Sequence, residues 1–276
     1  MGDYLRPSSL DEALAALGRP FTVLAGGTDF YPARVGRAID DNVLDIGGIE
    51  ALRGIAPEAS GWRLGATTTW SQLVEADLPP LFDGLKQAAR EVGGRQIQNA
   101  GTIAGNLCNA SPAADGVPPL LALDAEIEIA NVAGRRRLPL KAFILGNRRT
   151  ALAPGDLVIA LHVPKPRHSA RSAFLKLGAR RYLVISIAMA AATLEVAEGR
   201  VSAARIAVGS CSAVAQRLPD LETALAGAAL DKKLADRVAP EHLAPLAPID
   251  DVRGSVAYRH DAAVTLLRRL LEGLAS

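Results

Sequence analysis

The sequence contains few residues of the kinds that bind metals or form disulfides. Its 276 residues include two cysteines, Cys108 and Cys211, which form no C-x-x-C pair. An iron–sulfur cluster normally takes four cysteine ligands, so this chain is expected to hold no cluster of its own. The four histidines form no H-E-x-x-H pattern and have no zinc-like spacing to the cysteines. These absences predict a reduced, cytoplasmic chain with no metal site.

Long apolar runs and a strong excess of either charge are also missing. The longest apolar run, from Leu183 to Leu194, is interrupted by Ser186 and Thr193 and is too short to span a bilayer. The first residues show no basic segment followed by an apolar one, which predicts no signal peptide. The charge is nearly balanced, with 31 basic and 29 acidic residues. We therefore expect a globular protein with no transmembrane segment and no nucleic-acid partner.

Common nucleotide-binding and hydrolase motifs are absent as well. No two glycines are separated by a single residue, which excludes G-x-G-x-x-G. No glycine is followed by lysine, which excludes a P-loop. The G-x-S-x-G pattern of a serine hydrolase is missing too. A nucleotide site in this chain must be built from other elements.

The apolar pattern predicts an α+β protein, and the length allows two cores. Ser9 to Glu12 form a capping-box pattern at the start of a helix. Residues 164–169 contain two prolines and no apolar periodicity, so they are predicted to be a linker. The expected strands are 21–25, 42–46, 62–66, 126–130, 156–163, 172–177, 185–196 and 201–208. The expected helices are 10–17, one from about 70, 81–92, one that follows Ser111 and Pro112 and ends at Ala122, 218–226, 231–239 and 255–274.

A glycine-rich loop follows the first predicted apolar strand. It consists of Ala25, Gly26, Gly27, Thr28 and Asp29. Paired glycines permit positive φ and let backbone N–H groups converge on an anion without a Cβ in the way. The hydroxyl of Thr28 adds a further donor. The pattern is typical of phosphate-binding loops, but a tight turn is the commoner explanation for one such loop alone.

A second glycine-bearing loop is predicted at residues 101–105. Its candidate ligand-binding residues, which continue beyond the loop, are Thr102, Gly105, Asn106, Asn109 and Asp115. They offer backbone donors, side-chain donors and a carboxylate that could hold a ribose or ribityl hydroxyl. Cys108 lies among them and is predicted to be a small buried packing residue. Two such loops facing each other would suit a pyrophosphate flanked by two sugars.

Both loops lie in segments that resemble a known family. The segments "VLAGGTDFYP" at 23–32 and "QNAGTIAGNLCNASPAADGVPPLLALDAEIEI" at 98–129 are similar to the paired FAD motifs of the molybdenum hydroxylases. Carbon monoxide dehydrogenase and xanthine dehydrogenase are members of that family. Further similarity occurs in "LRPSSLDEALAAL" at 5–17, "LGATTTWSQL" at 64–73 and "IDDVRGSVAYR" at 249–259. The resemblance therefore covers nearly the whole chain, and its second motif is long and specific.

The resemblance implies a two-lobed FAD-binding domain of the vanillyl-alcohol-oxidase type at residues 1–167, with lobes of about 1–52 and 53–167. A C-terminal domain of the molybdenum-hydroxylase flavoproteins would follow at 168–276. The first loop would bind the FAD pyrophosphate, and the second group of residues would surround the phosphates and sugars. An iron–sulfur small subunit and a molybdopterin large subunit would be the partners, in a dimer of heterotrimers. The chain would accept electrons from the clusters and pass them to NAD, a quinone or oxygen.

The sequence also departs from the family pattern. Ala104 precedes Gly105 where relatives often have two glycines, a mild change if Ala104 keeps a negative φ. Val184 stands where many relatives have Asp, near the expected position of the isoalloxazine ring. The resemblance therefore does not identify the electron acceptor. Two other functions remain possible from the residues alone: a self-sufficient FAD oxidoreductase, or a non-catalytic nucleotide-binding scaffold subunit. The substrate of the holoenzyme would be bound on another chain.

Overall fold

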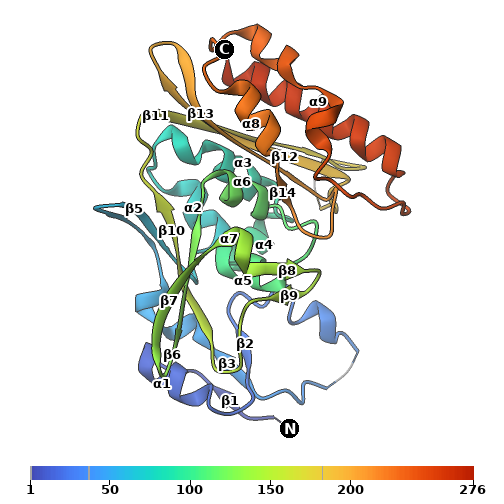
Figure 1. The fold of residues 1–276 in the computed structure, drawn as a ribbon. Helices are drawn as coiled ribbons and strands as arrows, with labels where there is room; N and C mark the ends of the chain where they lie inside the picture. Colours follow the sequence, from blue (N-terminus) through green and yellow to red (C-terminus); the bar gives the residue numbers. More distant parts are fainter. Residues whose placement is uncertain (1, 37, 182) are drawn as a thin grey trace.

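The chain begins with a small parallel sheet, at the bottom of Figure 1, whose strand order is β1-β3-β2. The computed structural model describes residues 2–36, 38–181 and 183–276. Helix α1 begins after Ser9, whose side chain accepts a hydrogen bond from the backbone N–H of Glu12, as the capping-box pattern predicts. The elements are β1 (Tyr4–Leu5), α1 (Leu10–Ala16), β2 (Thr22–Leu24) and β3 (Val43–Asp45), with 3₁₀ helices at Pro32–Arg34, Ile46–Gly48 and Glu50–Leu52.

A second sheet is antiparallel and has the strand order β4-β5-β10-β6-β7. Its strands are β4 (Ile55–Glu58), β5 (Gly61–Gly65), β6 (Glu126–Asn131), β7 (Gly134–Pro139) and β10 (Leu157–Pro164). Strand β10 lies between β5 and β6 and is buried along almost its whole length, because its side chains enter two different hydrophobic cores. The three arginines at 135–137 lie in the exposed edge strand β7, where their charges oppose pairing with another chain.

Helices fill the space between this sheet and the C-terminal part of the chain (Figure 1). They form the largest hydrophobic core, which includes the fully buried side chains of Trp70, Phe82 and Phe143. The elements are α2 (Trp70–Glu75), a 3₁₀ helix (Pro80–Phe82), α3 (Asp83–Glu91), α4 (Arg95–Ala100), α5 (Ile103–Asn109), α6 (Val117–Ala122), α7 (Leu140–Phe143) and the hairpin β8 (Ile144–Gly146) and β9 (Arg149–Thr150).

The C-terminal part is an antiparallel sheet of order β11-β12-β13-β14 with helices α8 and α9 on its outer face (Figure 1). Its inner face meets α3 and α6, where Ala88 and Ala122 share a core cluster with Phe174 and Met189. The elements are β11 (Ser169–Leu177), β12 (Ala188–Ala197), β13 (Arg200–Gly209), β14 (Gln216–Arg217), α8 (Pro219–Leu225), α9 (Val256–Leu274) and 3₁₀ helices at Lys232–Arg237 and Pro240–Leu243. Burial on both faces explains why β12 is apolar without alternation.

The end of the quoted segment at 249–259 has a structural role. Arg259, in the first turns of α9, is 3% exposed. Its guanidinium donates to the carbonyl oxygens of Ile187 and Ser210, at 2.5 and 3.0 Å, and to the Asp251 carboxylate at 2.7 Å. One side chain therefore holds α9, the end of β13 and the segment before β12 together.

The architecture confirms the α+β prediction, and most predicted elements are present with shifts of a few residues at their ends. Strand β12 begins at Ala188, three residues later than expected. The expected helix 231–239 is a 3₁₀ helix over Lys232–Arg237, and helix α4 was not expected. The predicted linker is shorter, because β10 continues to Pro164 and β11 begins at Ser169. In the described ranges of the chain, no helix is long and apolar enough to cross a membrane.

Candidate functional site

The first predicted loop follows strand β2 directly. Gly27 has a φ of +71°, a conformation that favours glycine, and the N–H of Tyr31 donates to its carbonyl oxygen at 3.1 Å. Within the described part of the chain, the backbone N–H groups of Gly26, Gly27, Thr28 and Asp29 donate no hydrogen bond to a protein group. A run of free backbone donors in a turn is an arrangement that binds anions.

The second motif is mostly helical rather than a loop. Helix α5 begins at Ile103, and the Thr102 hydroxyl caps it by accepting a hydrogen bond from the N–H of Gly105 at 3.1 Å. The prediction of a loop at 101–105 is therefore wrong for residues 103–105, which are helical. Ala104 lies inside α5 and keeps a negative φ, so its Cβ causes no backbone strain at this position. Thr102 also pairs with Thr69 in an isolated β-bridge, which fixes the start of the helix.

The two motifs are in direct contact. A Cβ on Gly26 would lie 1.8 Å from the carbonyl oxygen of Ala100, so the backbones touch. The Asn109 amide donates to the Asp29 carboxylate at 3.0 Å. A cavity of about 210 Å³ borders Gly26 and Thr102 at this contact. Residues that the sequence did not predict also line it: Gly47, Arg53, Thr67, Thr69 and Gln72.

The remaining polar residues of the second motif are engaged within the protein. Asn106 accepts a hydrogen bond from the N–H of Gly116 at 3.3 Å, which folds the chain after α5 back onto the helix. Asp115 is 8% exposed, and its carboxylate accepts hydrogen bonds from Lys176 at 2.8 Å and Ser186 at 2.9 Å. Burial raises the pKa of Asp115, and the Lys176 ammonium opposes that rise. This carboxylate therefore links the second motif to the C-terminal sheet.

Lys176 and Ser186 were not predicted to belong to the site. Lys176 lies near the end of β11, and Ser186 precedes β12, which places them 61 and 71 residues after Asp115. No local pattern distinguishes this lysine or this serine from others in the chain. The folded sheet alone brings them to the carboxylate.

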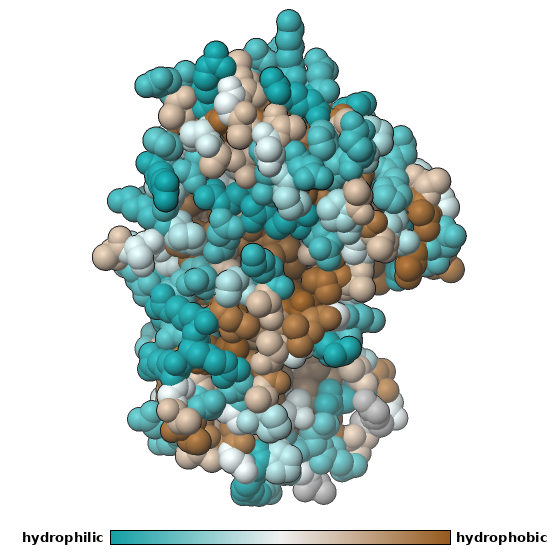
Figure 2. Space-filling view, in the orientation of Figure 1, coloured by the Kyte–Doolittle hydropathy of each residue, from teal (hydrophilic) through white to brown (hydrophobic). Residues whose placement is uncertain are grey.

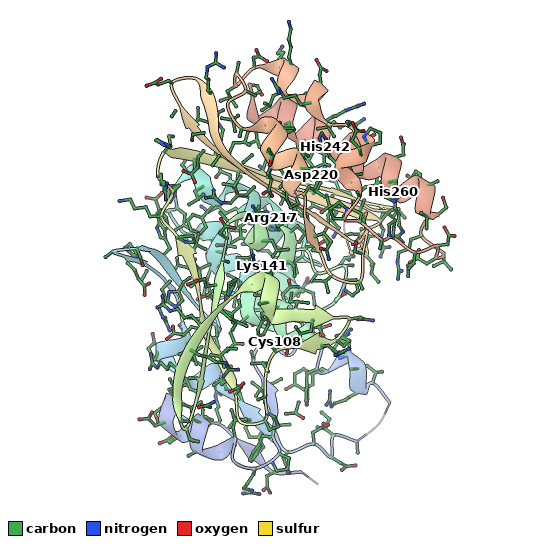
Figure 3. All side chains as sticks on the ribbon, in the orientation of Figure 1. Cys108, Lys141, Arg217, Asp220, His242 and His260 are labelled. Atoms are coloured by element: carbon green, nitrogen blue, oxygen red, sulfur yellow. The ribbon has the colours of Figure 1, made fainter. Side chains whose placement is uncertain are left out.

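Cys108 was predicted to be buried, and this prediction is wrong. Its side chain is exposed on α5, and Figure 3 shows it near the middle of the molecule, between the N-terminal sheet and the C-terminal sheet. On the face seen in Figure 2, apolar side chains gather across this middle region, and the surface below them is hollowed.

Comparison with protein families shows which family this chain belongs to. The model of the FAD binding domain in molybdopterin dehydrogenase matches residues 1–166. The chain belongs to this family. The model of the CO dehydrogenase flavoprotein C-terminal domain matches residues 173–274. The protein is thus an FAD-binding medium subunit of the molybdenum hydroxylase type. Its FAD-binding domain precedes its flavoprotein C-terminal domain, as expected.

Individual relatives match over almost their whole length. The carbon monoxide dehydrogenase medium chain of Afipia carboxidovorans is 30% identical over 275 residues, 98% of this chain and 95% of that one. The xanthine dehydrogenase FAD-binding subunit of Escherichia coli O157:H7 is 29% identical over 275 residues, 97% of this chain and 94% of that one. A solved structure of reconstituted CO dehydrogenase from Oligotropha carboxidovorans matches with a TM-score of 0.90 at 29% identity, covering 100% of this chain and 98% of that chain.

The residues of this medium subunit fit the cofactor of its family. FAD contains a pyrophosphate, and the free N–H groups from Gly26 to Asp29 are the kind of donor that a pyrophosphate accepts from. The contact between the two motifs places residues 102–109 beside those donors. Among the residues that the structure describes, no group of three or more His, Cys, Asp or Glu is placed to hold a metal ion.

Proposed function

We propose that this subunit binds one FAD without a covalent bond and passes electrons from a partner protein to an external acceptor. The observation that carries the proposal is the run of free backbone N–H groups from Gly26 to Asp29. A hydrogen bond from Asn109 to Asp29 holds this run beside the second motif. When bound, FAD supplies one-electron and two-electron redox chemistry, and the protein supplies binding and orientation.

Ten residues would hold the cofactor. The first loop would bind the pyrophosphate, and the second group would surround the phosphates and the ribityl or ribose groups: Ala25, Gly26, Gly27, Thr28, Asp29, Thr102, Gly105, Asn106, Asn109 and Asp115. Their present hydrogen bonds leave capacity for a ligand. Thr102 accepts from Gly105 and still has its own O–H to donate, and Asn106 keeps both amide N–H groups. Asn109 keeps its side-chain carbonyl and a second N–H.

Non-covalent binding follows from the chemistry of the one thiol near the motifs. Attachment through Cys108 would need its thiolate as the nucleophile. At the ordinary thiol pKa of 9.0 only a small fraction is thiolate at neutral pH. Burial of an apolar ring together with the backbone donors is a sufficient basis for tight binding. Acid precipitation should therefore release the yellow colour into the supernatant.

The electron partners are placed on other chains. Two relatives are named as a medium chain and a medium subunit, which supports a small and a large partner. We assign the iron–sulfur clusters to the small subunit, molybdopterin to the large subunit, and a dimer of heterotrimers in the cytoplasm to the assembly. The division into residues 1–167, with lobes of about 1–52 and 53–167, and residues 168–276 belongs to the same proposal. The final acceptor would be NAD, a quinone or oxygen.

Two measurements of flavin absorbance test the proposal. The isolated FAD-loaded chain, mixed with candidate aldehydes or N-heterocycles, should keep its visible flavin absorbance. The same chain co-expressed with its neighbouring subunits should lose that absorbance when substrate is added. Bleaching of the isolated chain by substrate would instead identify a self-sufficient oxidoreductase. A purified chain that is colourless even after incubation with FAD would identify a scaffold subunit.

A further inference from the structure

His162 lies on the middle strand of the five-stranded antiparallel sheet, with a carboxylate at each of its two ring nitrogens. The residue is 6% exposed and belongs to β10. Its Nδ1 is 3.0 Å from Oε2 of Glu58 in β4, and its Nε2 is 2.8 Å from Oε2 of Glu128 in β6. In the strand order β4-β5-β10-β6-β7, Glu58 reaches past β5 to the ring. One side chain therefore connects three strands of this sheet.

Both contacts are hydrogen bonds only when each ring nitrogen carries a proton. An ionised carboxylate can only accept, and a neutral imidazole has a single N–H, whereas the imidazolium has two. Burial of Glu128 acts to raise the pKa of its carboxyl, but the hydrogen bond from His162 and the charges of two arginines on β7 outweigh it and hold that pKa below its usual value. The Glu58 side chain is 32% exposed, and glutamates in contact with water are ionised at neutral pH. The two contacts together thus require the imidazolium.

The charges around the ring balance one another before its own second proton is counted. Residues that pair across neighbouring strands have side chains on the same face, which places an arginine of β5 and a glutamate of β6 beside His162. The guanidinium of that arginine donates to the carbonyl oxygens of Ala51 and Ile159, at 3.2 and 3.4 Å. The hydrogen bonds to the two carboxylates, rather than an excess of negative charge, therefore favour the second proton. Three carboxylates and three guanidinium groups lie around the ring: Glu58 from β4, Arg63 from β5, Glu126 and Glu128 from β6, and Arg135 and Arg137 from β7.

The two carboxylates differ in how well water can replace the ring. The side chain of Glu128 is 9% exposed, so leaving it without a donor costs more than doing so at Glu58. A ring that holds a single proton therefore keeps it on Nε2, facing Glu128. Its Nδ1 then turns a lone pair towards an oxygen that also only accepts, and the Glu58 carboxylate moves into water.

We propose that His162 is a proton-dependent clamp on the hairpin formed by β4 and β5. With two ring protons it fastens the end of the edge strand β4 to the middle of the sheet, and loss of the Nδ1 proton releases Glu58. The release loosens the hairpin without detaching it, because the N–H of Lys165 still donates to the carbonyl oxygen of Ser60 in the turn, at 2.8 Å. None of these residues belongs to the two FAD motifs, so the clamp does not depend on the function proposed for them.

Nitrogen NMR of the full FAD-loaded chain, isotope-labelled at its four histidines, detects the ring protons directly. The variant His162→Gln assigns the signal. At pH 6 we expect protons on both ring nitrogens, and between pH 6 and pH 9 Nδ1 should lose its proton while Nε2 keeps one. Glu58→Gln provides an amide N–H that can donate to a bare Nδ1, so its ring should lose the Nδ1 proton at a lower pH. The matched control Glu126→Gln removes the same charge from the strand opposite and should titrate close to the wild type.

Hydrogen exchange of residues 55–61, followed by mass spectrometry, measures how firmly the hairpin is held. Comparison of the wild type with Glu58→Gln at each pH cancels the effect of pH on exchange itself. The ratio of the wild-type rate to the variant rate should rise about tenfold between pH 6 and pH 9, which corresponds to about 1.4 kcal/mol. Residues 188–197 of β12 serve as an internal control and should show no such change.

Four results would overturn the proposal. A ring nitrogen of His162 without a proton at pH 6 would show that the imidazolium is not present. A ring that loses its Nε2 proton first, or keeps both protons through pH 9, would show that Glu58 is not released. Equal shifts of the titration in Glu58→Gln and Glu126→Gln would show only a general effect of charge. A constant exchange ratio at residues 55–61 would show that the ring does not hold the hairpin.

Discussion

The buried pair of Lys176 and Asp115 gives the sharpest prediction about how the two domains are held together. Their side chains are 5% and 10% exposed, and the ammonium and carboxylate are 2.8 Å apart. Replacement of the lysine, Lys176→Met, keeps the length of the side chain but leaves a buried carboxylate with Ser186 as its one remaining described partner. Breaking such a pair costs about 3–5 kcal/mol of unfolding free energy, because one charge stays buried without compensation.

Protonation of Asp115 gives an independent estimate that falls within this range. Its ordinary pKa is 3.8, so keeping the carboxyl protonated at pH 7 costs about 4 kcal/mol, at 1.36 kcal/mol for each pH unit. The pKa is already raised in the folded state, and loss of the ammonium raises it further. A carboxyl whose pKa is higher in the folded than in the unfolded state stabilises the fold at pH values below its unfolded-state pKa. That stability is lost as pH rises through its folded-state pKa. The variant should therefore be penalised more at pH 7 than at pH 5.

Urea unfolding at both pH values, followed by circular dichroism, measures these free energies. The double variant Lys176→Met, Asp115→Asn removes both charges and should recover most of the loss. The exposed Lys141→Met, labelled in Figure 3 as wild-type Lys141, should change stability by less than about 0.5 kcal/mol. The explanation fails if Lys176→Met costs under about 1 kcal/mol, or if the second substitution recovers nothing.

Three further predictions concern single residues. Gly27→Val should lose FAD, measured as flavin per chain, because φ is +71° and the new Cβ would collide with a tyrosine ring. The control variant Gly199→Val has a similar φ of +70° but open space around it, so it should keep FAD. Arg259→Lys should lower the free energy of unfolding in urea by about 3 kcal/mol, because lysine cannot serve three acceptors with a planar fork. Arg34→Gln should raise the Asp41 pKa from about 2 towards 3.8 in an NMR titration. The stability that the wild-type pair contributes should be fully present above pH 3.8 and lost as pH falls through about 2.

Each of these predictions has a contrary result. Wild-type flavin content in Gly27→Val would remove the first loop from the cofactor site. An unchanged urea midpoint in Arg259→Lys would show that the three hydrogen bonds contribute nothing net. A stability difference between wild type and Arg34→Gln that stays constant between pH 5 and pH 2 would show that the arginine does not shift Asp41.

The sequence predicted elements well where their cause is local. The cap of α1 depends on Ser9 and a backbone N–H three residues later, and the cap of α9 depends on Ser255 in the same way. Both helices were therefore expected close to their observed ends. The second motif was misjudged because Gly105 suggested a loop. The hydroxyl of Thr102 in fact caps a helix that contains this glycine, and the β-bridge to Thr69 that fixes the start of that helix is not visible in a local pattern.

The candidate FAD site likewise has one part that the sequence alone predicts and another that only the folded structure reveals. The sequence alone located the candidate anion-binding loop, because the proposed chemistry lies in the backbone of consecutive residues, 26–29, and depends on glycine at a positive φ. The tertiary structure alone decided that Asp115 faces Lys176 and Ser186. These contacts join residues that are distant in the sequence, and many lysines and carboxylates were available for them. Which pair is buried depends on how the two domains pack, since packing removes water from one pair and leaves the others solvated.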